Sequence, residues 1–144
     1  MPITAGNGLL LKAIYADGTE CSEPRTFLVI ETSDKFIRAL NVSSIKGKEH
    51  KLALPSNERI LKYSPPFKRD SFVKLDALYE FEYFSELELS VLCGNRTMDP
   101  VQLSIIHSKY SLYSNTYEIL KQRISAQDIR SRNPHLLKER RITH

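Results

Sequence analysis

The sequence predicts an α+β domain in which a small, strongly bent antiparallel sheet or barrel is followed by C-terminal helices. Strand-like stretches fill the chain as far as Val91, and helix signals appear only from Asp99 onward. The apolar and charged fractions, 41% and 26%, are those of an ordinary globular domain. A chain of 144 residues can bury a sufficient core without disulfides. We therefore expect one domain over residues 1–130 and a basic C-terminal tail over residues 131–144.

Three strands are predicted before residue 45. Residues 8–15 form the first, and the Asp-Gly pair within residues 16–19 predicts a hairpin-type turn after it. Residues 26–30 are continuously apolar, as in a strand buried on both faces. Residues 36–42 form a half-buried strand that leads into Ser43 and Ser44. Because strand side chains alternate, these two serines point to opposite faces if the strand continues through them.

The middle of the chain predicts a long excursion and then a strand pair. Residues 45–70 contain three prolines and only short apolar stretches, which indicates a basic loop with at most a short strand. Residues 73–83 alternate between apolar and polar side chains, the pattern of a strand with one buried face. Residues 86–91 repeat that pattern, so we expect a bend near Phe84 and another strand after it.

Two helices are predicted near the C-terminus. Asp99 at the N-cap and Pro100 at the first helical position are typical of a helix start. A second helix is expected over residues 116–130, capped by Ser114 or Asn115, and Pro134 ends any helix that reaches it.

Positive charge is concentrated in two blocks. Residues 46–69 and residues 121–144 each hold seven lysines and arginines against two acidic residues, although the whole chain carries only +4. Two basic blocks on a nearly neutral body indicate a polyanionic partner. Ordinary solvated surface lysines are the alternative explanation.

Most familiar active sites are missing from the sequence. It contains no phosphate-binding loop motif, no H-E-x-x-H and no G-x-S-x-G, and its four histidines lack metal-ligand spacing. Cys21 and Cys93 are too isolated for a disulfide framework. We therefore expect neither a cofactor nor a metal. No apolar run reaches the roughly 20 residues of a membrane span, and no signal-peptide pattern opens the chain, so we expect a cytoplasmic protein without membrane attachment.

Arg25, Ser43, Ser44 and Lys46 are the candidate reaction centre. Arg25 precedes the buried strand over residues 26–30, and the other three follow the end of the next strand. Metal-free RNA cleavage needs donors for the charge that develops on phosphate oxygens, and guanidinium, ammonium and hydroxyl groups supply them. The general base is open: His50 or positioning of the substrate alone are the candidates. A surface turn with ordinary charges is the competing interpretation.

Several of these stretches resemble the MazF/PemK-like toxins, and most closely the ToxN-type toxins. Residues 24–31 are similar to the family strand in which a basic residue beside a proline precedes an aliphatic run. Residues 41–50 resemble the hydroxyl turn of the ToxN group, where a Thr-Ser pair is followed two residues later by a lysine. Residues 72–78 are similar to the strand that leads into the C-terminal half, so the resemblance spans about residues 8–113.

The resemblance implies a MazF-like, SH3-like barrel and a metal-independent endoribonuclease toxin of a bacterial or phage toxin–antitoxin system. Such an enzyme leaves 2′,3′-cyclic phosphate and 5′-hydroxyl ends, and an antitoxin, here a structured RNA, keeps it silent. Arg25 would contact the scissile phosphate, Ser43 and Ser44 would be the hydroxyl pair, and Lys46 the turn lysine. The partners would be substrate mRNA, the RNA antitoxin and further copies in a homo-oligomer or a toxin–RNA assembly. The residues expected to bind RNA are Lys48, His50, Lys51, Lys62, Lys68, Arg69, Lys121, Arg123, Arg130 and Arg132.

Three alternatives stay open at this point. The chain is a MazF/PemK-type toxin with a protein antitoxin, a nucleic-acid-binding barrel without catalysis, or a protein-binding module that uses its acidic strands from Glu80 to Glu88.

Overall fold

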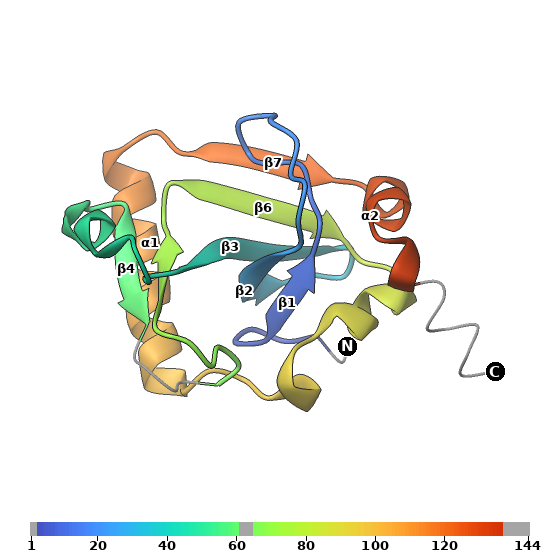
Figure 1. Cartoon of the computed structure of the whole chain (residues 1–144), viewed down its shortest axis with the longest axis horizontal. Helices are drawn as coiled ribbons and strands as arrows, with labels where there is room; N and C mark the ends of the chain where they lie inside the picture. The colour runs from blue at the N-terminus through green and yellow to red at the C-terminus, as the bar shows by residue number, and fades with distance from the viewer. Residues whose placement is uncertain (1–2, 61–64, 137–144) are drawn as a thin grey trace.

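The computed structural model describes residues 3–60 and 65–136, and within them seven strands form one mostly antiparallel sheet. The strands are β1 (Gly8–Leu11), β2 (Arg25–Thr32), β3 (Phe36–Ser44), β4 (Asn57–Ile60), β5 (Ser71–Lys74), β6 (Ala77–Glu82) and β7 (Leu120–Ile124). The helices are α1 (Pro100–Thr116) and α2 (Ala126–Arg132), with short 3-10 turns η1 (Glu49–Ala53), η2 (Ser85–Ser90) and η3 (Cys93–Asn95). The predicted α+β class is confirmed (Figure 1).

Strand β3 is the centre of the sheet. Along one of its edges the sheet divides into two branches, which we call the β5 wing and the β6 wing. One edge pairs with β2 along most of its length, while the other edge pairs with β6 near Ala39 and with β5 from Val42 onward. Strand β4 extends the β5 wing, and β7 extends the β6 wing by parallel pairing (Figure 1). We call the point between Ala39 and Val42 the fork of the sheet. The end of β3, with Ser43 and Ser44, therefore lies beside the β5 wing.

The prediction of a barrel was wrong, because the sheet does not close. In the described part of the chain β7 pairs only with β6, and the outer edge of β1 meets loop residues through isolated bridges from Asn7 to Thr97 and from Leu9 to Val91. The chain leaves the sheet after β6, where residues 85–90 form η2 and not the expected strand. The alternation of Leu87 and Leu89 was misleading, since Leu87 is buried within a 3-10 turn and Leu89 is exposed.

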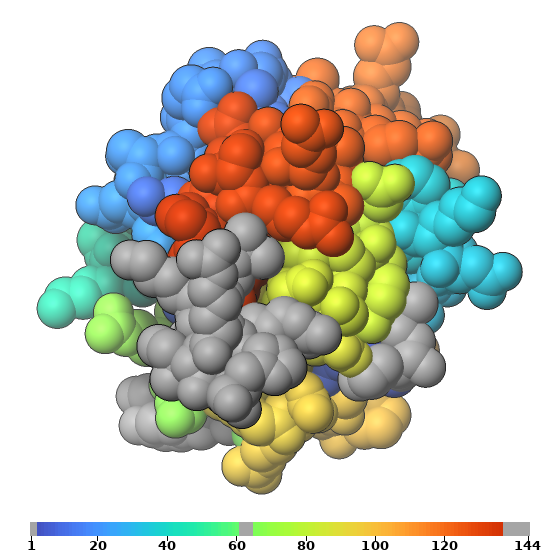
Figure 2. Space-filling model, turned by 90° about the vertical axis from the view of Figure 1, so that its right-hand side faces the viewer, coloured from blue at the N-terminus to red at the C-terminus, as the bar shows by residue number. Residues whose placement is uncertain are grey.

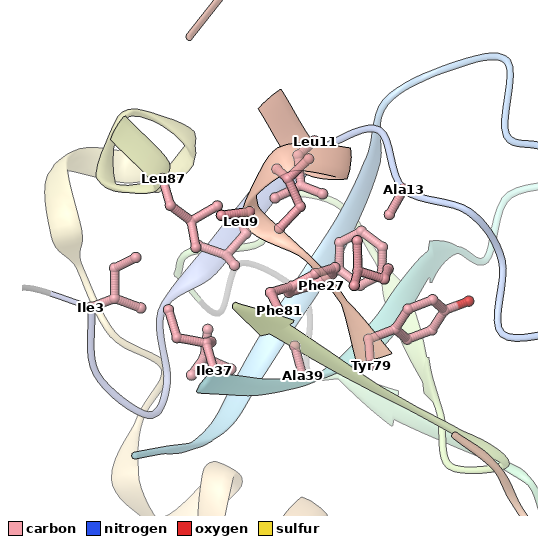
Figure 3. Packing of buried hydrophobic residues seen from close by; sticks show 14 of the residues in the cluster. Ile3, Leu9, Leu11, Ala13, Phe27, Ile37, Ala39, Tyr79, Phe81 and Leu87 are labelled. Atoms are coloured by element: carbon pink, nitrogen blue, oxygen red, sulfur yellow. The ribbon is translucent and has the colours of Figure 1, made fainter. Parts of the chain in front are cut away.

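Hydrophobic side chains fill both faces of the sheet. On one face, the Phe27 ring lies 5.0 Å from Tyr79 and 5.1 Å from Phe81, both in edge-to-face geometry (Figure 3). On the other face, Leu28 and Leu40 belong to a second cluster beneath α1. The prediction that residues 26–30 are buried on both faces is confirmed for residues 27–30. Aromatic pairs of this geometry add about 0.5–1.5 kcal/mol each beyond their buried area.

Two segments form different secondary-structure elements from those that their sequence patterns predicted. The alternation over residues 73–83 is interrupted by a turn at Asp76, so it forms β5 and β6 instead of one strand. The expected helix over residues 116–130 was wrong, since β7 occupies residues 120–124 and the second helix begins after Ser125. Ile124 packs in the core as part of β7, so pairing with the free edge of β6 overrode the helical pattern of this segment.

Both helix N-termini are capped by side chains. Gln102 N donates to Asp99 Oδ2 at 3.0 Å, which confirms the predicted start of α1, and Asp128 N donates to Ser125 Oγ at 3.1 Å in α2. The packed body also extends beyond residue 130. Asn133 is fully buried and exchanges two hydrogen bonds with the Lys12 backbone, at 2.7 and 2.9 Å. Figure 2 shows α2 covering this face beside η2.

These contacts move the end of the packed body to at least Leu136, which is 1% exposed. The sequence placed residues 131–136 in the tail because Pro134 was expected to end any helix there. The remainder of the expected tail, residues 137–144, lies outside the described residues.

Candidate functional site

A cavity of about 380 Å³ opens beside the fork of the sheet, between β2, the end of β3 and β5. We call it the cationic cavity. Its described lining includes the three cations Arg25, Lys48 and Lys74, and no lining residue that the structure describes is acidic. The lining residues are Tyr15, Pro24, Arg25, Thr26, Asn41, Val42, Ser43, Ser44, Lys48 and Lys74. The cavity therefore favours an anion.

Arg25 is oriented by the loop that precedes β2. Its Nε donates to the Tyr15 hydroxyl at 2.8 Å, which fixes the plane of the guanidinium. Burial alone would lower the pKa of Arg25, but hydrogen bonds with Cys21 and Tyr15 outweigh it and raise that pKa. For Tyr15 the effect of burial is the reverse, because burial raises the pKa of its hydroxyl. At neutral pH the wall of the cavity therefore presents a charged guanidinium beside a protonated phenol, and both are donors.

A tight turn after β3 places Lys48 over the end of that strand. Lys48 N donates to Ile45 O at 2.6 Å, and Gly47 has a φ of +75°, a conformation that favours glycine. The turn lets Lys48 Nζ donate to Ser43 Oγ at 3.2 Å. Gly47 therefore bends the chain so that the Lys48 ammonium group lies beside Ser43.

Ser44 and Lys46 have different positions in this turn. Ser44 lines the cavity, and its Oγ accepts from Lys46 N at 3.4 Å. The Lys46 residue is exposed and is absent from the described lining, so the structure brings together three of the four predicted centre residues, Arg25, Ser43 and Ser44. The ammonium beside the serines is that of Lys48, two residues further on.

Lys74 stands at the end of β5 and is half-buried. Burial is the largest cause of its lowered pKa. Repulsion from Lys51, Lys48 and Arg25 lowers the pKa further, while attraction to Asp76 raises it. A lysine with a lowered pKa releases its proton at lower pH than an exposed lysine does, so its neutral amine is more available as a proton acceptor.

The floor of the cavity is a cross-linked part of the sheet. Thr26 Oγ1 donates to Val42 O at 2.9 Å, and Asn41 Nδ2 donates to Thr26 O at 3.0 Å. Asn41 is only 5% exposed. These bonds supplement the ladder between β2 and β3, so Arg25 and the two serines start from a rigid backbone.

The first basic block lies around the cavity with varied exposure. Lys51 is half-buried near Lys74, and His50 is exposed on η1. Lys68 and Arg69 are exposed in the segment before β5, outside the described cavity lining. Lys62 lies outside the described residues.

The described arginines of the second basic block, Arg123, Arg130 and Arg132, are paired with carboxylates. Arg123 Nη2 lies 3.5 Å from Glu80 Oε1, and Arg130 Nη2 lies 4.0 Å from Glu86 Oε1. Arg123 and Arg130 also cover the rings of Phe36 and Phe84. A separate pair of contacts joins Arg132 to Glu20 and Asp128. Lys121 is exposed on β7 and belongs to none of these described pairs.

Sequence reasoning missed Tyr15, Asn41 and Lys74 as site residues. Lys74 stood at a polar position of an alternating strand, which only places it opposite the core. Tyr15 was the expected end of the first strand, but β1 ends at Leu11. A signal was present for Asn41, because a polar residue on an otherwise apolar strand must satisfy its amide when it is buried.

The described residues contain no group of three or more histidine, cysteine or acidic side chains placed to hold a metal ion. Among the described helices, none combines the length and apolar character that crossing a membrane requires. A comparison with models of known protein families and with curated proteins found no match.

Proposed function

We propose that this protein is an endoribonuclease that cleaves RNA in the cationic cavity through attack of a 2′-hydroxyl on the adjacent phosphate. The observation that carries the proposal is the convergence of Arg25, Lys48, Lys74 and the serines Ser43 and Ser44 on a cavity without a described acidic residue. The cavity holds charged donors for phosphate oxygens on rigid strands, as in-line attack requires. The products are a 2′,3′-cyclic phosphate and a 5′-hydroxyl end.

Arg25 and Lys48 bind the non-bridging phosphate oxygens in this proposal. Negative charge grows on these oxygens as the fifth oxygen approaches phosphorus, and the guanidinium and ammonium groups stabilise it. Ser43 acts through Lys48, because its Oγ accepts from Lys48 Nζ and so positions that ammonium. Ser44 adds a hydroxyl at the same edge of the cavity.

Lys74 is the proposed proton acceptor. The titratable side chains in the described lining are Tyr15, Arg25, Lys48 and Lys74, and the pKa values of Tyr15 and Arg25 are raised. The neutral amine of Lys74 takes the 2′-hydroxyl proton while O2′ bonds to phosphorus and the bond from phosphorus to O5′ breaks. O5′ takes a proton from water at the open side of the cavity. His50, the candidate from the sequence, is absent from the described lining.

We further propose that the ribonuclease acts as a toxin that an RNA antitoxin holds inactive. The resemblance of residues 24–31 and 41–50 to ToxN-type toxins supports this biological role. A structured RNA would be held by the same cations that bind substrate phosphates. Expression from an inducible promoter should arrest growth with the wild-type chain and should be harmless with Arg25→Ala.

The enzymatic proposal is tested with a fluorescent single-stranded RNA in EDTA. Wild type is compared with Arg25→Ala, Ser43→Ala and the control Arg96→Ala, which removes an exposed arginine outside the cavity. We expect cyclic phosphate ends from wild type and Arg96→Ala. Loss of Arg25 should slow cleavage by about 10²–10³-fold. A 2′-deoxy substitution at the mapped cleavage position should prevent cleavage without preventing binding.

Full cleavage by a folded Arg25→Ala variant would contradict the proposed reaction centre. Salt-sensitive RNA binding without cleavage by any variant would instead establish a binding protein without catalysis. Circular dichroism and thermal unfolding of each variant separate these outcomes from a folding defect.

A further inference from the structure

A second cavity of about 320 Å³ adjoins the cationic cavity. Tyr15, Asn41 and Lys74 line both, so the two cavities are neighbours that share these three residues. We call the second one the neighbouring cavity. Its lining residues are Tyr15, Ala16, Asp17, Thr19, Asn41, Lys74, Asp76, Ala77, Tyr79 and Leu120.

The two cavities differ in electrostatic character. The carboxylates of Asp17 and Asp76 line the neighbouring cavity together with Lys74, whereas the described lining of the cationic cavity has no acidic residue. Carboxylates repel phosphate and accept hydrogen bonds from N–H groups. An RNA strand has the matching alternation, since each anionic phosphate is followed by a neutral base that carries donors on its edge.

The apolar part of the neighbouring cavity suits a flat ring. Ala16, Ala77 and Leu120 contribute aliphatic surface, and Leu120 is 50% exposed. The Tyr15 ring lies at the boundary between the two cavities, where an aromatic side chain can stack on an unpaired base. Tyr79 supports the wall: it is 3% exposed, and its hydroxyl accepts from Ala16 N at 3.0 Å.

The two carboxylates differ in how far they are already used. Asp17 Oδ1 accepts from Thr19 N at 2.9 Å and from Thr19 Oγ1 at 2.7 Å, so that oxygen stabilises its own turn. No hydrogen bond or ion pair joins the Asp76 side chain to any residue within 3–60 or 65–136. Its backbone is fixed, because Asp76 O accepts from Leu120 N at 3.0 Å. Asp76 is thus a positioned acceptor that the protein itself leaves available.

We propose that the neighbouring cavity binds the base next to the scissile phosphate and selects guanine through Asp76. The inference rests on the proposed function, because it places the phosphate of the same RNA in the cationic cavity. Guanine offers N1–H and the 2-amino group side by side, and these two parallel donors match the two oxygens of one carboxylate. Adenine and cytosine offer an amino group without an adjacent N–H donor, and uracil offers a single N–H.

The test measures binding and cleavage with matched oligonucleotides. The probes for binding are deoxyuridine heptamers, which lack the 2′-hydroxyl, with a central guanine, adenine, cytosine, uracil or hypoxanthine. Hypoxanthine lacks the 2-amino group but keeps N1–H. The same sequences as RNA report cleavage. Wild type is compared with Asp76→Asn and with Asp34→Asn, which removes an exposed carboxylate from the turn between β2 and β3.

We expect wild type and Asp34→Asn to bind the guanine heptamer about tenfold more tightly than the uracil heptamer, with hypoxanthine in between. In Asp76→Asn the advantage of guanine should fall to within about twofold, because the amide presents an N–H group where the carboxylate accepted one. RNA cleavage should show the same order of bases.

An unchanged guanine preference in Asp76→Asn, or no base preference in wild type, would overturn the inference. The two proposals fail separately. RNA cleavage without base preference would contradict the guanine site but support the ribonuclease proposal. An Asp76-dependent guanine preference without cleavage would support the guanine site but contradict the ribonuclease proposal.

Discussion

The cationic cavity and the surface formed by β3, β6, β7 and α2 are both rich in basic residues, but only on the second do described acidic side chains lie among the cations. Arg25, Lys48 and Lys74 line a cavity without a described acidic neighbour in the lining. On the other surface, Arg38, Arg123 and Arg132 each lie within ion-pair distance of a carboxylate. We call the latter the ion-paired surface, comprising Arg38, Arg123, Arg130 and Arg132 with their acidic partners.

The difference shows why a count of basic residues is a poor guide to RNA binding. An arginine that already holds a carboxylate must lose that partner before it can neutralise a phosphate, so its net contribution to binding is small. Three of the ten residues that the sequence assigned to RNA, Arg123, Arg130 and Arg132, are of this paired kind. Their ion pairs join β7 to β6 and join α2 to η2 and to the loop before β2.

Among the substitutions that distinguish the cationic cavity from the ion-paired surface, those at Lys74 are expected to have the largest effect on the cleavage rate. Replacing it by methionine removes the proposed proton acceptor and should lower the cleavage rate by about 10²–10⁴-fold. Lys74→Arg keeps the charge and should still bind RNA, but it should cleave as poorly as Lys74→Met. The rate of the wild type should rise with pH through the lowered pKa of Lys74, because only the neutral amine accepts a proton.

The pH profile distinguishes catalysis by Lys74 from a packing role. The charged groups that influence the pKa of Lys74 are Arg25 on β2, Lys48 and Lys51 around η1, and Asp76 after β5, and Tyr15 lines the same cavity. Lys35→Arg, at an exposed turn, is the matched control. A Lys74→Arg enzyme with wild-type rate and profile would exclude Lys74 as the base.

A smaller effect is expected from the comparison of Lys48→Ala with Arg123→Ala. Loss of Lys48 should weaken RNA binding about tenfold in low salt and reduce the slope of log affinity against log salt by about 1, because one phosphate contact is lost. Loss of Arg123 should leave the slope unchanged, since its charge is used by Glu80. Fluorescence anisotropy across a salt series measures both. Equal slopes for the two variants would contradict the distinction between the regions.

Glu80→Gln is expected to act on stability and not on RNA. Hydrogen bonding from Arg38 lowers the pKa of Glu80. The folded-state pKa is therefore below the unfolded value, so the stabilisation is present above the unfolded pKa and is lost as the pH falls through the folded pKa. We expect a loss of about 1 kcal/mol at neutral pH by urea unfolding, with the two proteins converging in acid. A destabilisation that persists in acid would indicate altered packing instead.

The smallest effect is expected at Lys46. Because its side chain is outside the described lining of the cationic cavity, Lys46→Ala should change the cleavage rate by no more than about twofold, whereas Ser43→Ala should have a larger effect. Rates under identical conditions decide between these residues. A Lys46→Ala enzyme as impaired as Arg25→Ala would restore the turn lysine of the resemblance to the centre of the reaction.

Local patterns predicted the sheet and the start of the first helix, but not the closure of the sheet. Residues 27–30 were correctly predicted as part of a buried strand because a continuous apolar run needs two covered faces. The barrel and the helix over residues 116–130 failed for one reason: both depended on which segment pairs with a distant sheet edge. Such a choice depends on tertiary contacts that a local window does not contain.

The candidate site was predictable only where its residues follow a strand end. Arg25 and the two serines stand next to apolar runs, and adjacent antiparallel strands bring such ends together. Lys74 reaches the same cavity because β5 pairs with the last residues of β3, a contact across about thirty positions of sequence. Lys48 replaced Lys46 because the turn at Gly47 reverses the chain, which composition alone does not reveal.

The cross-linked floor under the cationic cavity has a consequence for the substrate. Hydrogen bonds from Thr26 and Asn41 join β2 to β3 directly beneath Arg25 and Ser43, so the walls have little freedom to move apart. Under the proposed function, the adjustment on binding then comes from the RNA, which has to unstack a nucleotide and turn it into the cavity. We expect strands held in duplexes to resist this protein and unpaired loops to be its preferred targets.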